Sequence, residues 1–231
     1  MSELLAVGTF DGLIFDCDGT LVDTAPAHLA ALKIALARVQ LHVDDAWYFE
    51  RVGLTPDALL DQYESHYSKL PVTRPVLLAP YNVAFHGSLE EMREVQVVAD
   101  MARAWHGKVP MCVASNGQRS NVQASLKAVG LLPLFDFLVT VEDVEHGKPA
   151  PDIFLEGARR MKVEPARCMV LEDSEEGLEA ARRAGMPSID VRAIWTPSWR
   201  ASKLTQTKSA SIQPQRHAKT QPLGIMPLEE G

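Results

Sequence analysis

Two carboxylates separated by a single residue follow a short apolar run near the start of the chain. The run is Leu13-Ile14-Phe15, and Asp16 and Asp18 come directly after it, before a Gly-Thr turn. In a strand, side chains at positions i and i+2 point the same way, so both carboxylates can converge on one small volume. Two close carboxylates repel unless a proton or a cation intervenes, and hard oxygen ligands suit Mg²⁺. The spacing favours a catalytic or metal-binding acid pair over the alternative, two solvated turn residues.

Three further polar groups carry residue types that could join such a site. Ser115-Asn116 offers a hydroxyl and backbone N–H groups to a phosphate oxygen. Lys148 lies on a proline-stiffened loop and could neutralise a phosphoryl group, and Glu172-Asp173 could complete a cation site. Taken singly, each group has an ordinary explanation: a helix N-cap, a solvated surface lysine and an acidic helix start.

Alternating strands and helices would bring these groups together. Apolar runs predict strands at 12–15, 109–114, 137–141, 168–171 and 188–191. Helical periodicity predicts helices at 89–105, from the end of Ser115-Asn116-Gly117 to Val129, and at 151–161. A further helix is predicted to run to Ala184, with Ser174 as its N-cap. Such alternation predicts an α/β fold with a doubly wound parallel (Rossmann-like) sheet. All four polar groups then lie at the carboxyl ends of parallel strands, where open α/β sheets bind ligands. Chance is a poor explanation for four such polar groups at one edge of the sheet.

A helical insertion interrupts this alternation directly after the Asp pair. Leucines and other apolar residues at helical spacing predict helices at 24–39, 45–52 and 56–67. Prolines punctuate residues 70–88, which we expect to form an irregular return linker. We therefore expect an α/β core made of residues 1–23 and 89–193. Residues 24–88 are expected to form an inserted α-helical cap that lies over the site like a lid.

The last segment differs in composition from the rest of the chain. From residue 194 onward Ser, Thr, Gln, Lys and Pro predominate, and no acidic residue occurs between Arg192 and Leu228. Such a segment has too little apolar surface to offset the entropy lost on ordering. We predict a disordered basic tail at 194–231, with a weak basic interaction arm as the alternative.

Composition limits the classes of partner. The chain has 231 residues, and its net charge of −7 gives no electrostatic footprint for nucleic acid or an anionic membrane. Cys17, Cys112 and Cys168 each lie in or beside an apolar run, which predicts buried thiols in a reducing compartment. No signal peptide or membrane-spanning run is recognisable, so a cytoplasmic location is expected.

The four polar groups occur in the order and context typical of one family. The motifs Asp16-x-Asp18-Gly-Thr, Ser115-Asn116, Lys148-Pro149 and Glu172-Asp173 resemble those of the haloacid dehalogenase-like phosphohydrolases. The resemblance covers roughly residues 10–192 and is closest to the beta-phosphoglucomutase-like subgroup. Within that subgroup, Trp105-His106-Gly107 is similar to the bacterial fructose-1-phosphate phosphatases.

The resemblance implies a role for each matching residue. Asp16 would attack phosphorus and form an aspartyl-phosphate, and Asp18 would act as general acid and then general base. Mg²⁺ would be held by the Asp16 carboxylate, the Asp18 backbone carbonyl and Asp173, with Glu172 close by. The residues implied in holding the phosphoryl oxygens are Thr20, Ser115, Asn116 and Lys148. The residues implied in meeting the substrate from the cap are His28, Gly53, Leu54 and Thr55.

The implied function is a Mg²⁺-dependent phosphatase that hydrolyses a small sugar phosphate, with fructose 1-phosphate as the first candidate. A beta-phosphoglucomutase is the second hypothesis, and a non-catalytic sugar-phosphate binder the third. Mutases of the subgroup place an arginine in the cap loop where this chain has Pro56, and Asp57 would repel a second phosphate. Hydrolysis is therefore preferred. The expected partner is a small phosphomonoester, and the sequence leaves the oligomeric state open, with a monomer as the expectation.

Overall fold

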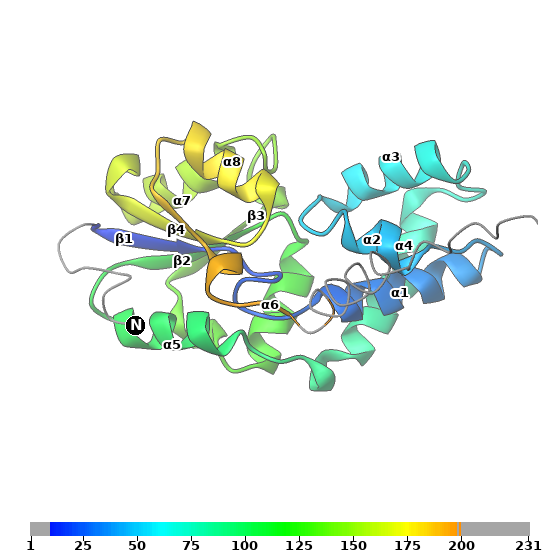
Figure 1. The fold of residues 1–231 in the computed structure, drawn as a ribbon, viewed down its shortest axis with the longest axis horizontal. Coiled ribbons are helices and arrows are strands. Elements are labelled where there is room, and N and C mark those ends of the chain that lie inside the picture. The colour runs from blue at the N-terminus through cyan, green and yellow to red at the C-terminus, as the bar shows by residue number, and fades with distance from the viewer. Residues whose placement is uncertain (1–9, 198, 200–231) are drawn as a thin grey trace, which may run out of the picture. The chain divides into compact units, whose positions relative to one another are not determined.

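The computed structural model describes residues 10–197 and residue 199, and its centre is a five-stranded parallel sheet (Figure 1). The strands lie in the order β3-β2-β1-β4-β5. Their bounds are β1 Gly12–Phe15, β2 Met111–Ser115, β3 Phe137–Thr140, β4 Cys168–Glu172 and β5 Ser188–Asp190. This is the expected α/β, Rossmann-like architecture, and each predicted strand is found within two residues of its expected bounds.

Both faces of the sheet are covered by helices, which explains why its central strands are apolar up to their last residues. Alternate residues of β1 enter two separate cores: Leu13 and Phe15 contact one, and Ile14 the other. The first core includes helices α5 (Gln96–Trp105) and α6 (Arg119–Ala128). The second includes α7 (Asp152–Met161) and α8 (Glu175–Arg183), on the opposite face in Figure 1.

Four helices come between β1 and α5, where the insertion is predicted. They are α1 Ala25–Ala37, α2 Asp45–Phe49, α3 Pro56–His66 and α4 Arg74–Gly87. These helices share a hydrophobic core of their own, which includes Leu36, Trp47, Tyr63 and Leu77. The term cap is used below for residues 24–88. The exact boundaries of the core and the cap stay predictions.

The expectation of an irregular linker at 70–88 is wrong, because α4 occupies Arg74–Gly87. Its first turn contains Pro75, where a missing N–H costs no hydrogen bond. Pro80 lies inside the helix, but the carbonyl that it leaves without an N–H partner belongs to Val76, which is exposed to water. Burial of Leu77 and Phe85 then outweighs the proline penalty.

The expected continuous helix at 89–105 is also wrong in its first part. Residues Leu89–Glu91 form a short 3₁₀ turn, and α5 begins only at Gln96. The intervening residues are extended because they pair with the loop that leaves β1. The Val95 N–H donates to the Leu21 carbonyl at 2.9 Å, and the Asp23 N–H donates to the Arg93 carbonyl at 3.0 Å. Tertiary pairing overrides the helical pattern here.

The folded part of the chain extends beyond residue 193. Ile194 and Trp195, the first residues of the expected tail, are partly buried against the core that contains Phe15. The rest of the predicted tail, apart from residues 196, 197 and 199, lies outside the described residues. Among the described residues, no helix is long and apolar enough to cross a membrane. The three cysteines are buried free thiols, as predicted.

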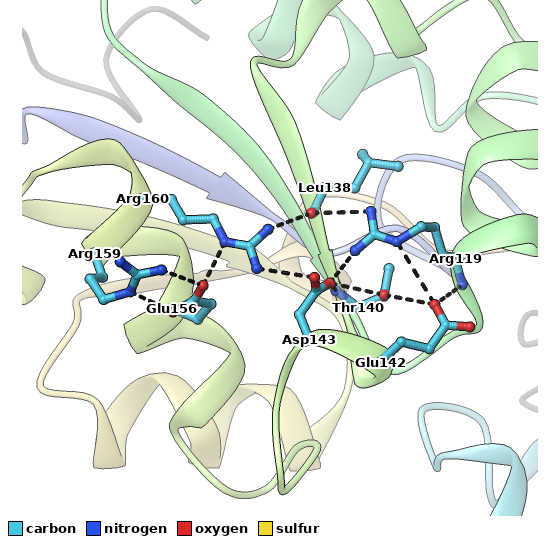
Figure 2. A network of polar contacts seen from close by, with 8 residues as sticks. All are labelled: Arg119, Leu138, Thr140, Glu142, Asp143, Glu156, Arg159 and Arg160. Atoms are coloured by element: carbon cyan, nitrogen blue, oxygen red, sulfur yellow. Dashed lines mark hydrogen bonds and ion pairs between the residues drawn. The ribbon is translucent and has the colours of Figure 1, made fainter.

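A network of arginines and acids fastens the end of β3 to two helices (Figure 2). The Asp143 carboxylate accepts hydrogen bonds from Arg119 on α6, from Arg160 on α7 and from the Thr140 N–H. Both arginines also reach the Leu138 carbonyl of β3. The network thus holds the segment after β3, which leads to Lys148, against the helix that follows Ser115-Asn116.

Candidate active site

The centre of the site is an ion-paired group at the carboxyl ends of β1 and β4. Lys148 Nζ lies 2.5 Å from Asp16 Oδ1 and 2.7 Å from Glu172 Oε2. All three residues are buried, with exposed fractions of 5, 6 and 1% respectively. The topology therefore brings together three of the predicted site residues that are far apart in sequence, and it places a charged lysine between two acids.

Burial and charge act in opposite directions on these groups. Burial raises the pKa of Asp16 well above its ordinary value, and the nearby Glu172 adds to this, while Lys148 opposes it. Burial would lower the pKa of Lys148, but Asp16 and Glu172 outweigh it and the pKa is raised. Lys148 therefore stays charged at neutral pH, and a further cation near Asp16 would favour its ionised form.

Glu172 is held by the start of α8. Its Oε1 atom accepts hydrogen bonds from the Asp173 N–H, the Ser174 N–H and the Ser174 hydroxyl, each at 2.9 Å. Ser174 is the N-cap of α8, as predicted, since its hydroxyl accepts the Gly177 N–H at 3.0 Å. A Cβ atom at Gly177 would lie 1.9 Å from Glu172 Oε2, so only glycine leaves room for this carboxylate.

Three of the four acids predicted to bind metal form one cluster. Oxygen atoms of Asp16, Glu172 and Asp173 lie within 4.8 Å of one another, and all three residues are buried. Thr20 donates a hydrogen bond to Asp173 at 3.2 Å. Gly19 has φ +89°, and a Cβ atom there would lie 2.5 Å from Asp173 Oδ2. A buried cluster of carboxylate oxygens, closely fitted by its surroundings, can hold a hard divalent cation.

The Asp18 side chain lies outside this cluster and faces the cap. Its carboxylate accepts hydrogen bonds from Thr24 at 2.6 Å and Ser115 at 3.3 Å, and His28 Nε2 lies 3.2 Å away. Burial would raise the pKa of Asp18, but the hydrogen bonds from His28, Thr24 and Ser115 outweigh it, so the pKa is lowered. The prediction that Asp18 lends its backbone carbonyl to a metal stays untested.

Two residues of this arrangement were not predicted from sequence. Thr24 holds Asp18 from the start of α1, and Tyr81 on α4 places its hydroxyl 2.5 Å from His28 Nδ1. The His28 ring also stacks on Phe85, with 4.2 Å between ring centroids. His28 lines the pocket, and its two ring nitrogens link Asp18 to Tyr81. Its expected contact with the substrate stays a prediction.

Asn116 joins two loops of the core to the cap. Its side-chain carbonyl accepts the Lys148 N–H at 2.8 Å, and its amide donates to the carbonyls of Lys148 and Gly53. Gly53 has φ +104°, and a Cβ atom there would lie 2.7 Å from Ser174 Cβ. The cap loop therefore approaches the core closely enough to require glycine at this position.

A pocket of about 100 Å³ lies between the acid group and the cap. The predicted site residues that line it are Asp16, Asp18, His28, Gly53, Leu54, Ser115, Asn116, Lys148 and Glu172. Thr20, Thr55 and Asp173 are not among its lining residues. Thr55 instead caps α3 by accepting the Ala58 N–H at 3.2 Å. The cap also contributes eleven lining residues that were not predicted as site residues, among them Tyr48, Arg51 and Tyr81.

Comparison with known proteins agrees with this geometry. A family model described as haloacid dehalogenase-like hydrolase matches residues 13–191, which include every residue of the site. The chain belongs to this family. Fructose-1-phosphate phosphatase YqaB of Escherichia coli (strain K12) is 35% identical over 185 residues, covering 80% of this chain and 98% of that protein. Phosphoglycolate phosphatase of the same strain is 28% identical over 200 residues, covering 77% and 79% respectively.

Solved structures of haloacid dehalogenase-like proteins share the fold. The CbbY protein of Rhodobacter sphaeroides, solved in complex with phosphate, is 26% identical, with a TM-score of 0.72 over 78% of this chain and 85% of that one. A beta-phosphoglucomutase from Clostridium difficile has a TM-score of 0.66 at 20% identity, over 87% of this chain and 99% of that one, and shows likeness of fold alone. The family match and the named activities of these relatives together identify the chain as a phosphatase of the haloacid dehalogenase-like hydrolases.

Proposed function

We propose that the protein is a Mg²⁺-dependent phosphatase for a small sugar phosphate, with fructose 1-phosphate as the first candidate. The observation that carries the proposal is the buried Asp16 carboxylate, which lines the pocket, is ion-paired with Lys148 and belongs to the carboxylate cluster. The named activity of the Escherichia coli relative supports the choice of sugar.

In the first half-reaction Asp16 attacks the phosphorus atom. A bond forms between the Asp16 carboxylate and phosphorus while the bond to the sugar oxygen breaks, and the product is an aspartyl-phosphate. The departing oxygen takes a proton from Asp18, whose carboxylate is positioned by His28 Nε2 at 3.2 Å. Lys148 offsets the negative charge that Asp16 and the phosphoryl group bring together.

In the second half-reaction water attacks the aspartyl-phosphate and regenerates Asp16. Asp18, left ionised by the first half-reaction, now takes a proton from the water, and the hydrogen bonds that lower its pKa stabilise the ionised form between the two steps. Ser115 and Thr24 hold the two Asp18 oxygens toward the pocket, so this carboxylate need not reorient between the steps. Because Asp18 and Asp16 are held side by side, both proton transfers take place at a fixed geometry and need no acid or base from solution.

The proposed metal ligands are Asp16 and Asp173, with Glu172 close by and the Asp18 backbone carbonyl as the family resemblance implies. When bound, Mg²⁺ would neutralise the phosphoryl oxygens and keep Asp16 ionised. Thr20 orients Asp173 through its hydrogen bond. The remaining roles are proposed from the family resemblance alone. They are phosphoryl binding by Thr20, Ser115 and Asn116, and substrate contact by His28, Gly53, Leu54 and Thr55.

A hydrolase is preferred to a mutase because of the cap loop. Pro56, which stands where mutases of the subgroup place an arginine, lines the pocket. Asp57, expected to repel a second phosphate, is ion-paired with Arg74 at 2.8 Å and is not among the lining residues. The preference for a hydrolase over a mutase therefore rests on the missing arginine alone. We also propose a cytoplasmic location, which the three buried free thiols support.

The experiment that tests the function is phosphate release from a panel of sugar phosphates, with Mg²⁺ and with EDTA. We expect release from fructose 1-phosphate that depends on Mg²⁺. Isomerised sugar phosphate without free phosphate would establish the mutase. Binding of sugar phosphates without turnover of any panel member would establish the non-catalytic binder and overturn the proposal.

A further inference from the structure

Arg51 is the one lining residue of the cap that carries a permanent charge. It shares the pocket with Asp16 and Lys148, and it also borders a second cavity of the cap, which Trp47 and Glu50 line. Most other cap residues in the first pocket are hydrocarbon: Leu32, Val52, Leu54, Leu59, Leu60 and Leu78. Lys148 is already paired with two acids. The next question is therefore which acceptors the N–H donors of Arg51 bind.

The guanidinium of Arg51 is held along only one of its edges. Its centre lies 4.3 Å from the centroid of the Trp47 ring, and Nη1 donates to the Trp47 carbonyl at 2.7 Å. Nη1 also lies 3.4 Å from the exposed carboxylate of Glu50. Nε is buried without a hydrogen-bond partner, and Nη2 makes no hydrogen bond within the part of the chain that the structure describes.

The unused edge is the one that other arginines of this chain use to bind paired oxygens. Arg159, Arg167 and Arg182 each direct Nε and Nη2 to the two oxygens of one carboxylate, over 2.6–2.9 Å. Two parallel N–H donors match two neighbouring oxygen acceptors in this geometry. A buried donor without an acceptor is unfavourable, so Arg51 gains most from a ligand that supplies both oxygens.

We propose that the Nε–Nη2 edge of Arg51 recognises a pair of neighbouring oxygen atoms on the leaving group of the substrate. Two sources share this chemistry, adjacent hydroxyls of a sugar and a carboxylate. The inference rests on the proposed function, because it concerns the part of the phosphomonoester that faces the cap. It makes Arg51 a specificity-determining residue, placed two residues before the loop that the sequence indicated.

The test compares three phosphomonoesters in the wild type and in Arg51→Met and Arg51→Lys. Fructose 1-phosphate offers paired hydroxyls, 2-phosphoglycolate a carboxylate, and phenyl phosphate no further oxygen. Loss of two hydrogen bonds should lower kcat/KM for the recognised ester, relative to phenyl phosphate, by about 10-fold or more, mainly through KM. Arg51→Lys should lose most of this preference for the recognised ester too, since an ammonium group does not present two parallel N–H donors.

Arg74→Met is the matched control, because it removes an arginine of the cap that pairs with Asp57 and Asp61 and does not line the pocket. The substrate ratio should be unchanged in this variant.

Selective loss with fructose 1-phosphate identifies hydroxyls as the source, and selective loss with 2-phosphoglycolate identifies a carboxylate. An equal effect of Arg51→Met on all three esters, or none, overturns the inference. If Arg51→Met unfolds, Arg51→Lys decides by the same ratio. Absence of turnover of every ester by the wild type would instead overturn the proposed function.

Discussion

The pocket has two walls that differ in how their polar groups are satisfied. The core wall, formed by Asp16, Ser115, Asn116, Lys148 and Glu172, holds buried charges and amides that all have partners within 3.3 Å. The cap wall is mostly hydrocarbon. Of the three buried side-chain atoms without a hydrogen bond among the described residues, one belongs to a lining residue of this wall, Arg51 Nε.

This difference indicates that the two walls serve different functions. A fully paired charge network keeps one geometry, which a reaction at phosphorus needs for any phosphomonoester. A wall with unpaired donors is incomplete without a ligand, and can distinguish one leaving group from another. Changes in the core wall should therefore affect turnover and stability, and changes in the cap wall should affect the choice of substrate.

The largest expected effect is that of Asp16→Asn in the core wall. The amide cannot form the aspartyl-phosphate, so phosphate release should fall by at least about 10⁴-fold. The fold should be retained, since the change removes a buried charge that Glu172 and Asp173 destabilise. Steady-state phosphate release and thermal unfolding check the two statements. Substantial phosphatase activity in this variant would refute the covalent mechanism.

Lys148→Met should lower stability as well as activity. It leaves the buried carboxylates of Asp16 and Glu172 without their shared cation, at a cost of about 3–5 kcal/mol in the free energy of unfolding. Urea unfolding in EDTA measures this cost, and Mg²⁺ should recover part of it. The exposed Lys127, changed to methionine, is the control and should be within about 0.5 kcal/mol of the wild type. A similar stability for both variants would show that the core wall does not depend on this charge.

The sequence was sufficient to predict the core wall but not the cap wall. Each core group lies at or beyond the carboxyl end of a strand, and parallel strands bring these ends to one edge, so sequence order alone placed Asp16 near Glu172. The β1 strand was predicted with its exact bounds because a short apolar run followed by acids and a turn has few alternatives.

The cap wall depends on contacts that no local pattern encodes. Tyr81 meets His28 across 53 residues and lies in α4, a helix that its prolines concealed. Arg51 comes after the short helix α2, which ends at Phe49 although the periodicity predicted it to residue 52. Which face of these segments points to the pocket is decided by packing among four helices, and only the structure shows it.

A smaller effect, on stability alone, is expected of Asp143→Asn in the network behind the core wall. Burial would raise the pKa of Asp143, but the Thr140 N–H and Arg160 outweigh it, so the folded-state pKa is lowered. The charge therefore adds stability that is present above about pH 4 and is lost as pH falls through the folded-state pKa. Wild type and variant should differ by about 2 kcal/mol at pH 7 and converge in acid. Exposed Glu145, changed to glutamine, is the control, and an unchanged difference below pH 4 would contradict the assignment.

The smallest effect is expected where the two walls meet, at Tyr81→Phe. Ionised Asp18 accepts a hydrogen bond from His28 Nε2–H, and His28 Nδ1 accepts one from the Tyr81 hydroxyl. Burial and the nearby Asp18 raise the pKa of Tyr81 and keep this hydroxyl protonated. Loss of that one hydrogen bond should lower kcat about fivefold with KM unchanged, because it loosens the general acid and base rather than the substrate. Tyr67→Phe is the control, since the Tyr67 hydroxyl accepts the Asp44 N–H away from the pocket. A rise in KM with kcat unchanged would place Tyr81 in the cap wall, as a substrate contact.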